Sequence, residues 1–438
     1  MFRFILGVYI FSLFYNIPIA NIGQELKLYD IIMPLILFQF VNNKDGILDF
    51  FKVDVVSKAI IRFCLWCSFT FLFTCVVNVV GENIKWIFQS SSYLFHLWGF
   101  GVATIFLRKD FLIDRKYFEK TLQFVLILGL LETIIIIGQN FGVVPYLWSR
   151  NYFDAYGDTS LSGTLGPNRV VPGSAMFLLF VLCISVITAK QSYRFNRPMA
   201  ILVAINCLLV VGLAGSRTAY VSIGTFLLVM TIFTPTSVLK FAIPAVAIGL
   251  LVAASFNLEK LNERLSFMLE YRIFDPFEKV EAVGNLDYYD QIGSGRKGKL
   301  TKAVEYLLEY PWLLPFGQGF LNLKYMNVGP EGKSIGPTRK MKDGNSAHNL
   351  YAQMIIENGL VGLVLYLSVL FSFLRGEWRN RNTYVLTALV IAVLVNIFFG
   401  ENFYVYRTSF GLLGLLLLVA TLVDFRRMNS AFLEQKDD

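Results

Sequence analysis

Residues 346–367 read SAHNLYAQMIIENGLVGLVLYL, and this stretch decides the fold class. It begins with polar residues and leads into an apolar run that continues to Leu374. A helix needs about 20 predominantly apolar residues to cross the hydrocarbon of a bilayer. Counting back from Leu374 therefore predicts a membrane edge near Ile355. At about 1.5 Å per residue, His348 is then expected about 10 Å beyond that edge, at the depth of lipid headgroups.

The whole chain has the composition of a membrane protein. Its 438 residues are 55% hydrophobic and only 16% charged, and its mean hydropathy is +0.57. Soluble domains carry more charge and lack long apolar segments that recur along the chain. The sequence therefore predicts an all-α polytopic membrane protein with about 12 transmembrane helices. The expected spans are 4–20, 28–42, 59–80, 86–107, 120–141, 171–189, 198–215, 219–234, 238–256, 349–374, 384–400 and 407–424.

Lys and Arg residues indicate the orientation of these spans, because cytoplasmic loops of membrane proteins are enriched in both. With the N-terminus inside, 20 such residues fall on the cytoplasmic side and six fall in the short loops on the other side. Both termini are therefore expected in the cytoplasm, and His348 on the outer face. The formal net charge of +8 follows from these anchoring charges, so it does not indicate nucleic acid as a partner.

Two outer loops divide the chain. Residues 1–256 are expected to hold the first nine spans, with an outer loop at 142–170 that is aromatic, polar and rich in turn residues. Residues 257–346 are expected to form one large outer loop. Residues 347–438 hold the last three expected spans and a short cytoplasmic tail.

The large loop has two features that favour an anionic ligand. Short helices are expected at about 257–272 and 298–310, and residues 291–346 carry nine bases and four acids, a net charge of +5. Arg296 and Lys297, in the segment GRKGK, precede the second helix, where basic side chains and free backbone amides together can bind phosphate. The alternative for both features is a solvated, flexible basic loop.

Arg217 lies in AGSRTAY, in the tight connection between the seventh and eighth expected spans. A charge at the edge of the membrane costs free energy unless it has a function or reaches water. A guanidinium binds phosphate oxygens through two parallel hydrogen bonds and stays charged at any relevant pH. Arg217 is therefore a candidate for phosphate binding. The alternative is a snorkelling residue that anchors the end of the helix.

His348 follows the polar turn GNSA and begins a helix, with Asn349, Gln353 and Glu357 at intervals of four residues along one face. Gly359 comes eleven residues after His348, about three helical turns, so we expect it below the histidine on the same face. A glycine there would leave a groove for an apolar chain or another helix. A histidine, whose ordinary pKa is about 6.5, can accept a proton from a sugar hydroxyl. An imidazole at headgroup depth suggests chemistry on a lipid-linked substrate.

Other polar residues and cysteines favour packing or anchoring. All five cysteines lie in apolar spans, so no disulfide framework is indicated, and the CxxC of Cys64 and Cys67 is read as packing. His96 lies among aromatic residues within a span and is expected to be a hydrogen-bonded packing residue. Glu132, an acid within a span, should face protein or a polar cavity. Glu401 follows the eleventh span, and the alternatives for it are to orient His348, to contact sugar or to anchor the helix at the interface.

Metal and nucleotide chemistry is not indicated. The outer loops contain no HExxH motif and no paired-carboxylate cluster, and the chain contains no P-loop pattern.

The residues of the long helix resemble a motif of bacterial O-antigen ligases and of O-antigen or exopolysaccharide polymerases. His348 and Asn349, followed after nine residues by Gly359 and then by Gly362, match the ligase-type motif position for position. Arg217 in GSRTAY looks like the first functional arginine of that family.

The resemblance extends to two further segments. Arg296, ahead of a helix and a glycine-containing turn, looks like the second functional arginine; the alternatives are Arg264, Arg272 and Arg339. The segment GTLGPNR at 163–169, which ends at Arg169, also resembles a family segment. The similarity covers about residues 163–425, and the first five spans are similar only as hydrophobic helices.

The resemblance implies a GT-C-like, inverting glycosyltransferase of the bacterial inner membrane, whose active site faces the periplasm and which needs no metal, nucleotide or other cofactor. Its donor would be an undecaprenyl-diphosphate-linked saccharide, and its acceptor a lipid-linked repeat or lipid A–core. Membrane lipids and a chain-length regulator would be further partners. His348 would help to deprotonate the acceptor hydroxyl, while Arg217 and Arg296 would bind the diphosphate and stabilise its charge as it leaves. The residues expected to bind substrate are Asn349, Arg169, Lys297 and Glu401.

Three activities are compatible with these motifs. A polymerase transfers a growing chain onto another lipid-linked repeat, whereas a ligase transfers it onto lipid A–core. We expect a polymerase, because polymerases vary more in sequence and the loops of this chain are idiosyncratic; a ligase is the alternative. A polysaccharide flippase is the second alternative, but it would have short outer loops and mid-membrane charges in several spans. Here the largest polar segment is one outer loop that ends at a histidine.

Overall fold

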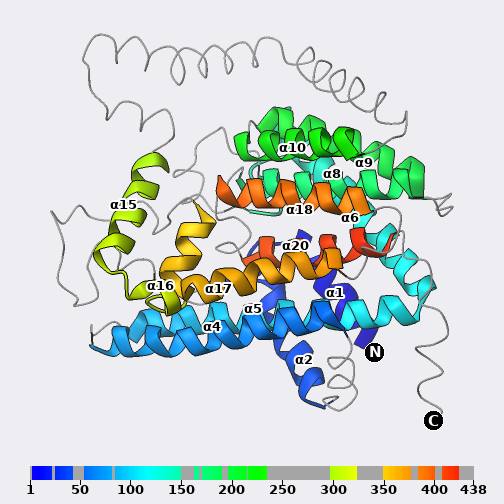
Figure 1. Ribbon diagram of the computed structural model, residues 1–438. Helices are drawn as coiled ribbons and strands as arrows, with labels where there is room; N and C mark the ends of the chain where they lie inside the picture. The colour runs from blue at the N-terminus through cyan, green and yellow to red at the C-terminus, as the bar shows by residue number, and fades with distance from the viewer. Residues whose placement is uncertain are drawn as a thin grey trace, which may run out of the picture.

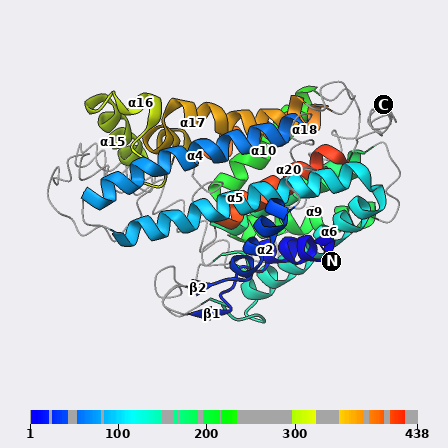
Figure 2. The same ribbon diagram turned by 90° about the horizontal axis from the view of Figure 1, so that it is seen from below.

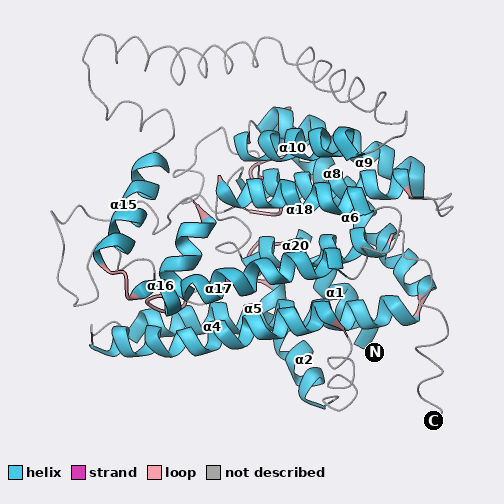
Figure 3. Ribbon diagram, viewed as in Figure 1, coloured by secondary structure: helices cyan, strands magenta, loops and turns pink. Residues whose placement is uncertain are grey.

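The structure is a computed structural model that is almost entirely helical in the parts it describes (Figure 3). The described residues are 2–21, 25–42, 54–80, 84–148, 162–166, 170–189, 196–214, 216–233, 296–322, 349–375, 383–399 and 407–423.

The described helices follow one another as α1 (Phe2–Phe14), α2 (Leu28–Asn42), α4 (Val55–Val80), α5 (Ile84–Ile113), α6 (Arg115–Asn140), α8 (Val170–Thr188), α9 (Asn196–Ala214), α10 (Arg217–Phe233), α15 (Arg296–Glu309), α16 (Leu313–Phe316), α17 (Leu350–Arg375), α18 (Thr383–Phe398) and α20 (Arg407–Leu422). Between α1 and α2, two short strands, β1 (Ala20–Asn21) and β2 (Glu25–Leu26), pair antiparallel.

Every expected span except 238–256 coincides with a described helix, and 238–256 lies outside the described residues. Among the described residues, four helices are long and apolar enough to cross a membrane, and six shorter apolar helices accompany them. The four long segments are Val55–Val79, Arg115–Asn140, Val171–Thr188 and Leu350–Leu374. The all-helical, multi-pass fold is thus confirmed, while the count of twelve spans and the single large outer loop stay predictions. Within that loop the expected helix at 298–310 is present as α15, and 257–272 lies outside the described residues.

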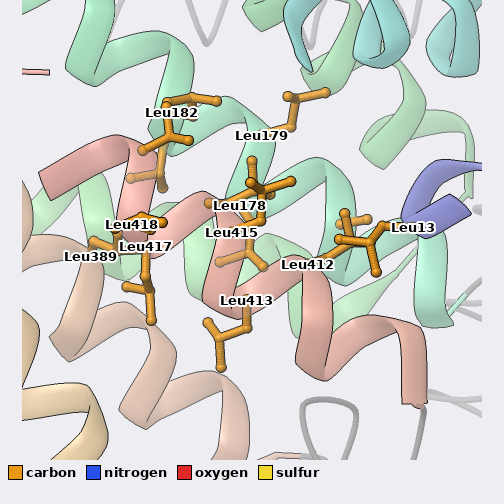
Figure 4. Packing of buried hydrophobic residues seen from close by; sticks show 14 of the residues in the cluster. Leu13, Leu178, Leu179, Leu182, Leu389, Leu412, Leu413, Leu415, Leu417 and Leu418 are labelled. Carbon is orange, nitrogen blue, oxygen red and sulfur yellow. The ribbon is translucent and has the colours of Figure 1, made fainter. Parts of the chain in front are cut away.

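Most helices run side by side in one bundle (Figure 1), and α8 and α20 lie at its centre. Leucines of α8, such as Leu178 and Leu182, pack against Leu415 and Leu418 of α20 (Figure 4). A helix that is apolar on all sides is buried among other helices. In α8, 83% of the residues in Val171–Thr188 are buried. The core therefore forms around the helices that have no polar face.

Charged residues gather at one end of the bundle. Arg3 of α1 donates a hydrogen bond of 2.6 Å to Asp114, which also accepts one from the backbone N–H of Tyr117 and so caps α6. The Tyr117 N–H and the Arg3 guanidinium lower the pKa of the Asp114 carboxyl. Arg108 of α5 pairs with Asp54 at 2.9 Å. The starts of α1, α4 and α6 therefore lie at the same end, as their common assignment to the cytoplasmic side predicts.

His96 and the cysteines have the packing roles expected of them. His96 lies with its Nε2 2.5 Å from Asp30 Oδ1 and its Nδ1 2.5 Å from the carbonyl of Ser92. Its side chain is 4% exposed, so it is a hydrogen-bonded packing residue between α2 and α5. All five cysteines are free, and Cys64 and Cys67 are buried.

Candidate active site

The helix that follows His348 is broken at Gly359. This glycine has φ 69° and ψ 179°, a conformation in which side chains with a Cβ are strained. Figure 1 shows the segment of α17 before the break turned across the end of the bundle, while the segment after it continues along the bundle. The expectation of one continuous helix from 349 to 374 is therefore wrong. The expected distance of His348 from the membrane edge assumed a straight helix, so it does not apply. His348 itself lies outside the described residues.

The turn PFGQGF, residues 315–320, fills the break. A Cβ on Gly359 would lie 2.2 Å from the Pro315 carbonyl oxygen, and one on Gly317, which has φ 74°, would lie 2.4 Å from the carbonyl carbon of Glu357. The backbone N–H groups of Gln318 and Gly319 donate to the carbonyls of Ile356 and Glu357, at 2.8 and 3.0 Å. These carbonyls are released by the break, so the turn satisfies them. The groove expected beside Gly359 is occupied by this turn.

Helix α4 supports the other side of the break. Trp66 Nε1 donates to the Asn358 carbonyl at 2.8 Å, and the Thr70 hydroxyl donates to Asn358 Oδ1 at 2.8 Å. One and two turns further along, Thr74 donates to the Phe320 carbonyl at 2.7 Å, and Asn78 donates to Asn322 Oδ1 at 3.2 Å. Thr70, Thr74 and Asn78 are fully buried.

This polar row was not predicted from the sequence, because the third expected span reads as a hydrophobic helix. A usable signal is present: Thr70, Thr74 and Asn78 recur every four residues within an otherwise apolar segment. Such a row places its polar groups on one face of the helix, which then has to contact protein or water rather than lipid.

The first segment of α17 connects α18 to α4. At its start, Asn349 Oδ1 accepts the Ala352 N–H at 3.0 Å as a helix cap, and Asn349 Nδ2 donates to the Phe398 carbonyl at the end of α18, also at 3.0 Å. At its end, Asn358 is held by α4 as described above. Nine residues from Asn349 to Asn358 rise about 13 Å in a helix. This short helix therefore lies across the bundle between two membrane helices.

The polar face expected on this segment is buried. Asn349, Gln353 and Glu357 are all 5% exposed or less. Gln353 Nε2 donates to Glu357 Oε1 at 3.1 Å, and Glu357 Oε2 accepts the Leu321 N–H at 3.2 Å. The stripe thus faces protein, and its carboxylate holds the turn after α16 in place.

Three further helix ends converge near Asn349. Asn396, two residues before Phe398 in α18, donates to the Ser222 hydroxyl of α10 at 2.8 Å. A Cβ on Gly173, near the start of α8, would lie 2.3 Å from Ser216 Oγ, which directly precedes α10. The starts of α8, α10 and α17 and the end of α18 therefore lie at one end of the bundle.

Of the expected site residues, Asn349 lies at these ends with its side chain described, and Arg217 begins one of the helices that meet there. Arg217 is the first residue of α10, and Arg296 and Lys297 begin α15; only their backbone is described. The residues outside the described part of the chain are His348, Arg169 and Glu401. The side chain of Asn349 forms hydrogen bonds with α17 and α18. Its contact with substrate stays a prediction. The roles of the other six also stay predictions.

Glu132 faces protein, as expected, and holds the segment 162–166. Its two carboxylate oxygens lie 2.8 Å from the N–H and 2.6 Å from the hydroxyl of Thr164. Gln139 accepts the Gly163 N–H at 2.9 Å, and Asn16 donates to the Leu165 carbonyl at 2.9 Å. All five residues 162–166 are buried. The segment is therefore fixed inside the bundle, four residues before the start of α8.

Among the described residues, no three His, Cys, Asp or Glu side chains are grouped so that they could hold a metal ion. Residues 200–367 match the family described as O-antigen ligase. A comparison with curated proteins finds no match.

Proposed function

We propose, from the match of residues 200–367 to the family described as O-antigen ligase, that the protein transfers a saccharide from undecaprenyl diphosphate to a sugar hydroxyl. The transfer takes place at the periplasmic face of the bacterial inner membrane, with both chain termini in the cytoplasm. The donor carries its own activated leaving group, so the reaction needs neither a nucleotide nor a metal. The substitution inverts the anomeric carbon.

The proposed roles follow from the chemistry of each side chain. His348 accepts the proton of the acceptor hydroxyl as that oxygen attacks the anomeric carbon. Arg217 and Arg296 bind the diphosphate through charge-assisted hydrogen bonds and stabilise the negative charge that it gains on leaving. The residues proposed to orient the saccharides and the diphosphate are Asn349, Arg169, Lys297 and Glu401.

The observation that supports these roles is that several helix ends meet at one end of the bundle. Asn349, next to His348 in the chain, is bonded to the end of α18, and α18 is bonded to α10 one and a half turns from Arg217. Val170, the residue that follows Arg169 in the chain, begins α8 at the same end. Residues that are far apart in the chain are thereby attached to neighbouring helix ends.

Polymerisation of the repeat units of an O-antigen or exopolysaccharide is the activity that we propose first. Transfer of the finished glycan to lipid A–core is the second candidate, and the family description, O-antigen ligase, favours it. Deletion in the native cell, followed by gel analysis of surface polysaccharide, separates the two. Loss of a polymerase leaves acceptor with a single repeat, or no secreted polymer. Loss of a ligase leaves bare acceptor and lipid-linked polymer.

His348→Ala and Arg217→Ala are each expected to abolish glycan transfer in membranes supplied with lipid-linked donor, because one removes the base and the other a ligand of the leaving group. Arg115→Ala is the matched control, since Arg115 lies at the opposite end, where it forms an exposed i, i+4 bridge to Glu119 and lies over the Phe118 ring. All three variants should insert in the membrane at the normal level. Transfer at the normal rate by either of the first two would refute the mechanism.

A further inference from the structure

Helix α15 has an apolar face that is wider than its contact with the rest of the protein. Ala303 and Tyr306 are buried against Ala352 and Ile356 of α17. On the adjoining face of the same helix, Val304 is 46% and Leu308 is 76% exposed. The apolar surface continues past the helix, because Trp312 is 60% and Phe316 is 47% exposed. These four residues, Val304, Leu308, Trp312 and Phe316, are termed the apolar stripe.

The apolar stripe is continuous with the outward face of α4. Phe316 stacks on Trp66 with ring centroids 5.9 Å apart, and Trp66 contacts Phe69 at 5.3 Å. Phe69 is itself 43% exposed, and Leu65 and Leu72, also on α4, are more exposed still. When a helix is long enough to cross a membrane, the apolar residues exposed on its surface are expected to face lipid. Figures 1 and 2 agree that α15 and α16 lie beside α4 and α17 at one end of the bundle.

Hydrogen bonds to α4 give the depth of this unit. The turn that follows α16 is bonded to Thr74 and Asn78. Val76 and Val79, at the same level of α4, are both 62% exposed. Residues 313–320 therefore lie no further from the middle of the membrane than the apolar, exposed part of α4.

The backbone of this unit is satisfied in the way that burial in hydrocarbon requires. The N–H groups of Gly317, Gln318 and Gly319 donate to Leu313, Ile356 and Glu357. The Asn322 N–H donates to Gly319, and the Leu321 N–H to the carboxylate of Glu357. Irregular backbone at membrane depth is tolerated where protein groups accept its hydrogen bonds.

We propose that α15 and α16 form a re-entrant unit whose apolar stripe inserts among the acyl chains of the leaflet at this end of the molecule. The occupant of the stripe is phospholipid, because the stripe joins the exposed apolar surface of α4, a helix long enough to cross a membrane, and includes an exposed tryptophan of the kind found at membrane interfaces. The first turn of α15 also carries Lys299, and a basic residue at that position suits the headgroups of anionic lipids. The proposal does not depend on the glycosyl transfer.

The test places a fluorescent label on the stripe of the full-length chain in phospholipid nanodiscs. Leu308→Cys is labelled with an environment-sensitive NBD group, and Glu305→Cys, on the exposed polar face of the same helix, is the matched control. The unsubstituted chain, labelled identically, gives the background from the native cysteines. Lipids with a spin label in the acyl chain are expected to quench the Leu308→Cys label several-fold more than the Glu305→Cys label. Aqueous iodide is expected to show the reverse order.

Two results would overturn the proposal. Quenching of the Leu308→Cys label by iodide as strong as that of the control would place the stripe in water. Protection from both quenchers would mean that another segment of this chain, or a second copy, covers it. If Leu308→Cys does not accumulate in the membrane, Val304→Cys replaces it with the same expectation.

Discussion

Gly359 determines how the polar start of α17 is oriented, because it separates a membrane helix from a short helix that lies across the end of the bundle. Its φ of 69° with ψ of 179° belongs to a region in which only glycine is unstrained. The turn at 315–320 packs against its Cα so closely that no side chain fits. The two constraints act together on the same residue.

Gly359→Ala is expected to destabilise the protein by at least the roughly 1–3 kcal/mol of backbone strain at such a position. The Cβ would also lie 2.2 Å from the Pro315 carbonyl oxygen, so the turn must move. The measurement is the thermal unfolding midpoint in detergent. Gly224→Ala is the control, since a Cβ at this helical glycine meets nothing within 4 Å. Equal midpoints for the two variants would contradict the expectation.

The break shows at residue level what sequence could and could not reveal. The pair Gly359 and Gly362 was recognised, but glycine is also frequent in continuous membrane helices, where small residues allow close packing. The decisive contacts come from Pro315 and Gly317, more than forty residues away in the chain. Periodicity within one segment carries no information about such a partner.

At the scale of elements, α4 links the turn and the broken helix. Asn358 receives two hydrogen bonds from this helix, one to its carbonyl and one to its side chain. The helices and their approximate limits were predictable from hydropathy, because each apolar run must either be buried in protein or face lipid. The arrangement of the segments 162–166 and 315–322 was not, since both are short, irregular and held by residues distant in sequence.

Thr70→Val is expected to destabilise the protein by about 1–3 kcal/mol, because it keeps the shape of the side chain but removes the buried hydroxyl that donates to Asn358 Oδ1. The loss should also lower glycan transfer, since the first segment of α17 would be less firmly held. Unfolding midpoint and transfer rate are both measured. Thr231→Val is the control, because Thr231 is exposed on α10 and bonds only to the Leu227 carbonyl of its own helix. A Thr70 variant that behaves like the Thr231 variant would show that this hydrogen bond does not support the site.

At the scale of the whole molecule, the two ends of the bundle differ in kind. One end has ion pairs between Arg3 and Asp114 and between Arg108 and Asp54. In the described part of the other end, side chains form hydrogen bonds with backbone groups, among them Asn349 with the Phe398 carbonyl and Glu357 with the Leu321 N–H. Ion pairs fix the first end of the bundle. Hydrogen bonds, which depend on direction, fix the second end, and a binding or catalytic site needs such bonds to hold its side chains in position. The charge pattern in sequence predicted the first end, whereas the bonds of the second depend on packing.

The convergence of α10 and α18 at this second end can be tested by cross-linking. Ser222 and Asn396 are joined by a hydrogen bond of 2.8 Å, so the pair Ser222→Cys and Asn396→Cys should be linked by a short bifunctional thiol reagent in native membranes. A protease site inserted between residues 290 and 291 would make the link visible, because cleaved halves would stay together on a denaturing gel. Each single variant measures the background from native cysteines. Ser222→Cys with Val385→Cys should not be linked, since 385 is eleven residues, about 16 Å, further along α18. Linkage of that mismatched pair, or its absence in the matched pair, would mean that the helix ends beside Asn349 and Arg217 do not meet, and the site that joins them would not exist.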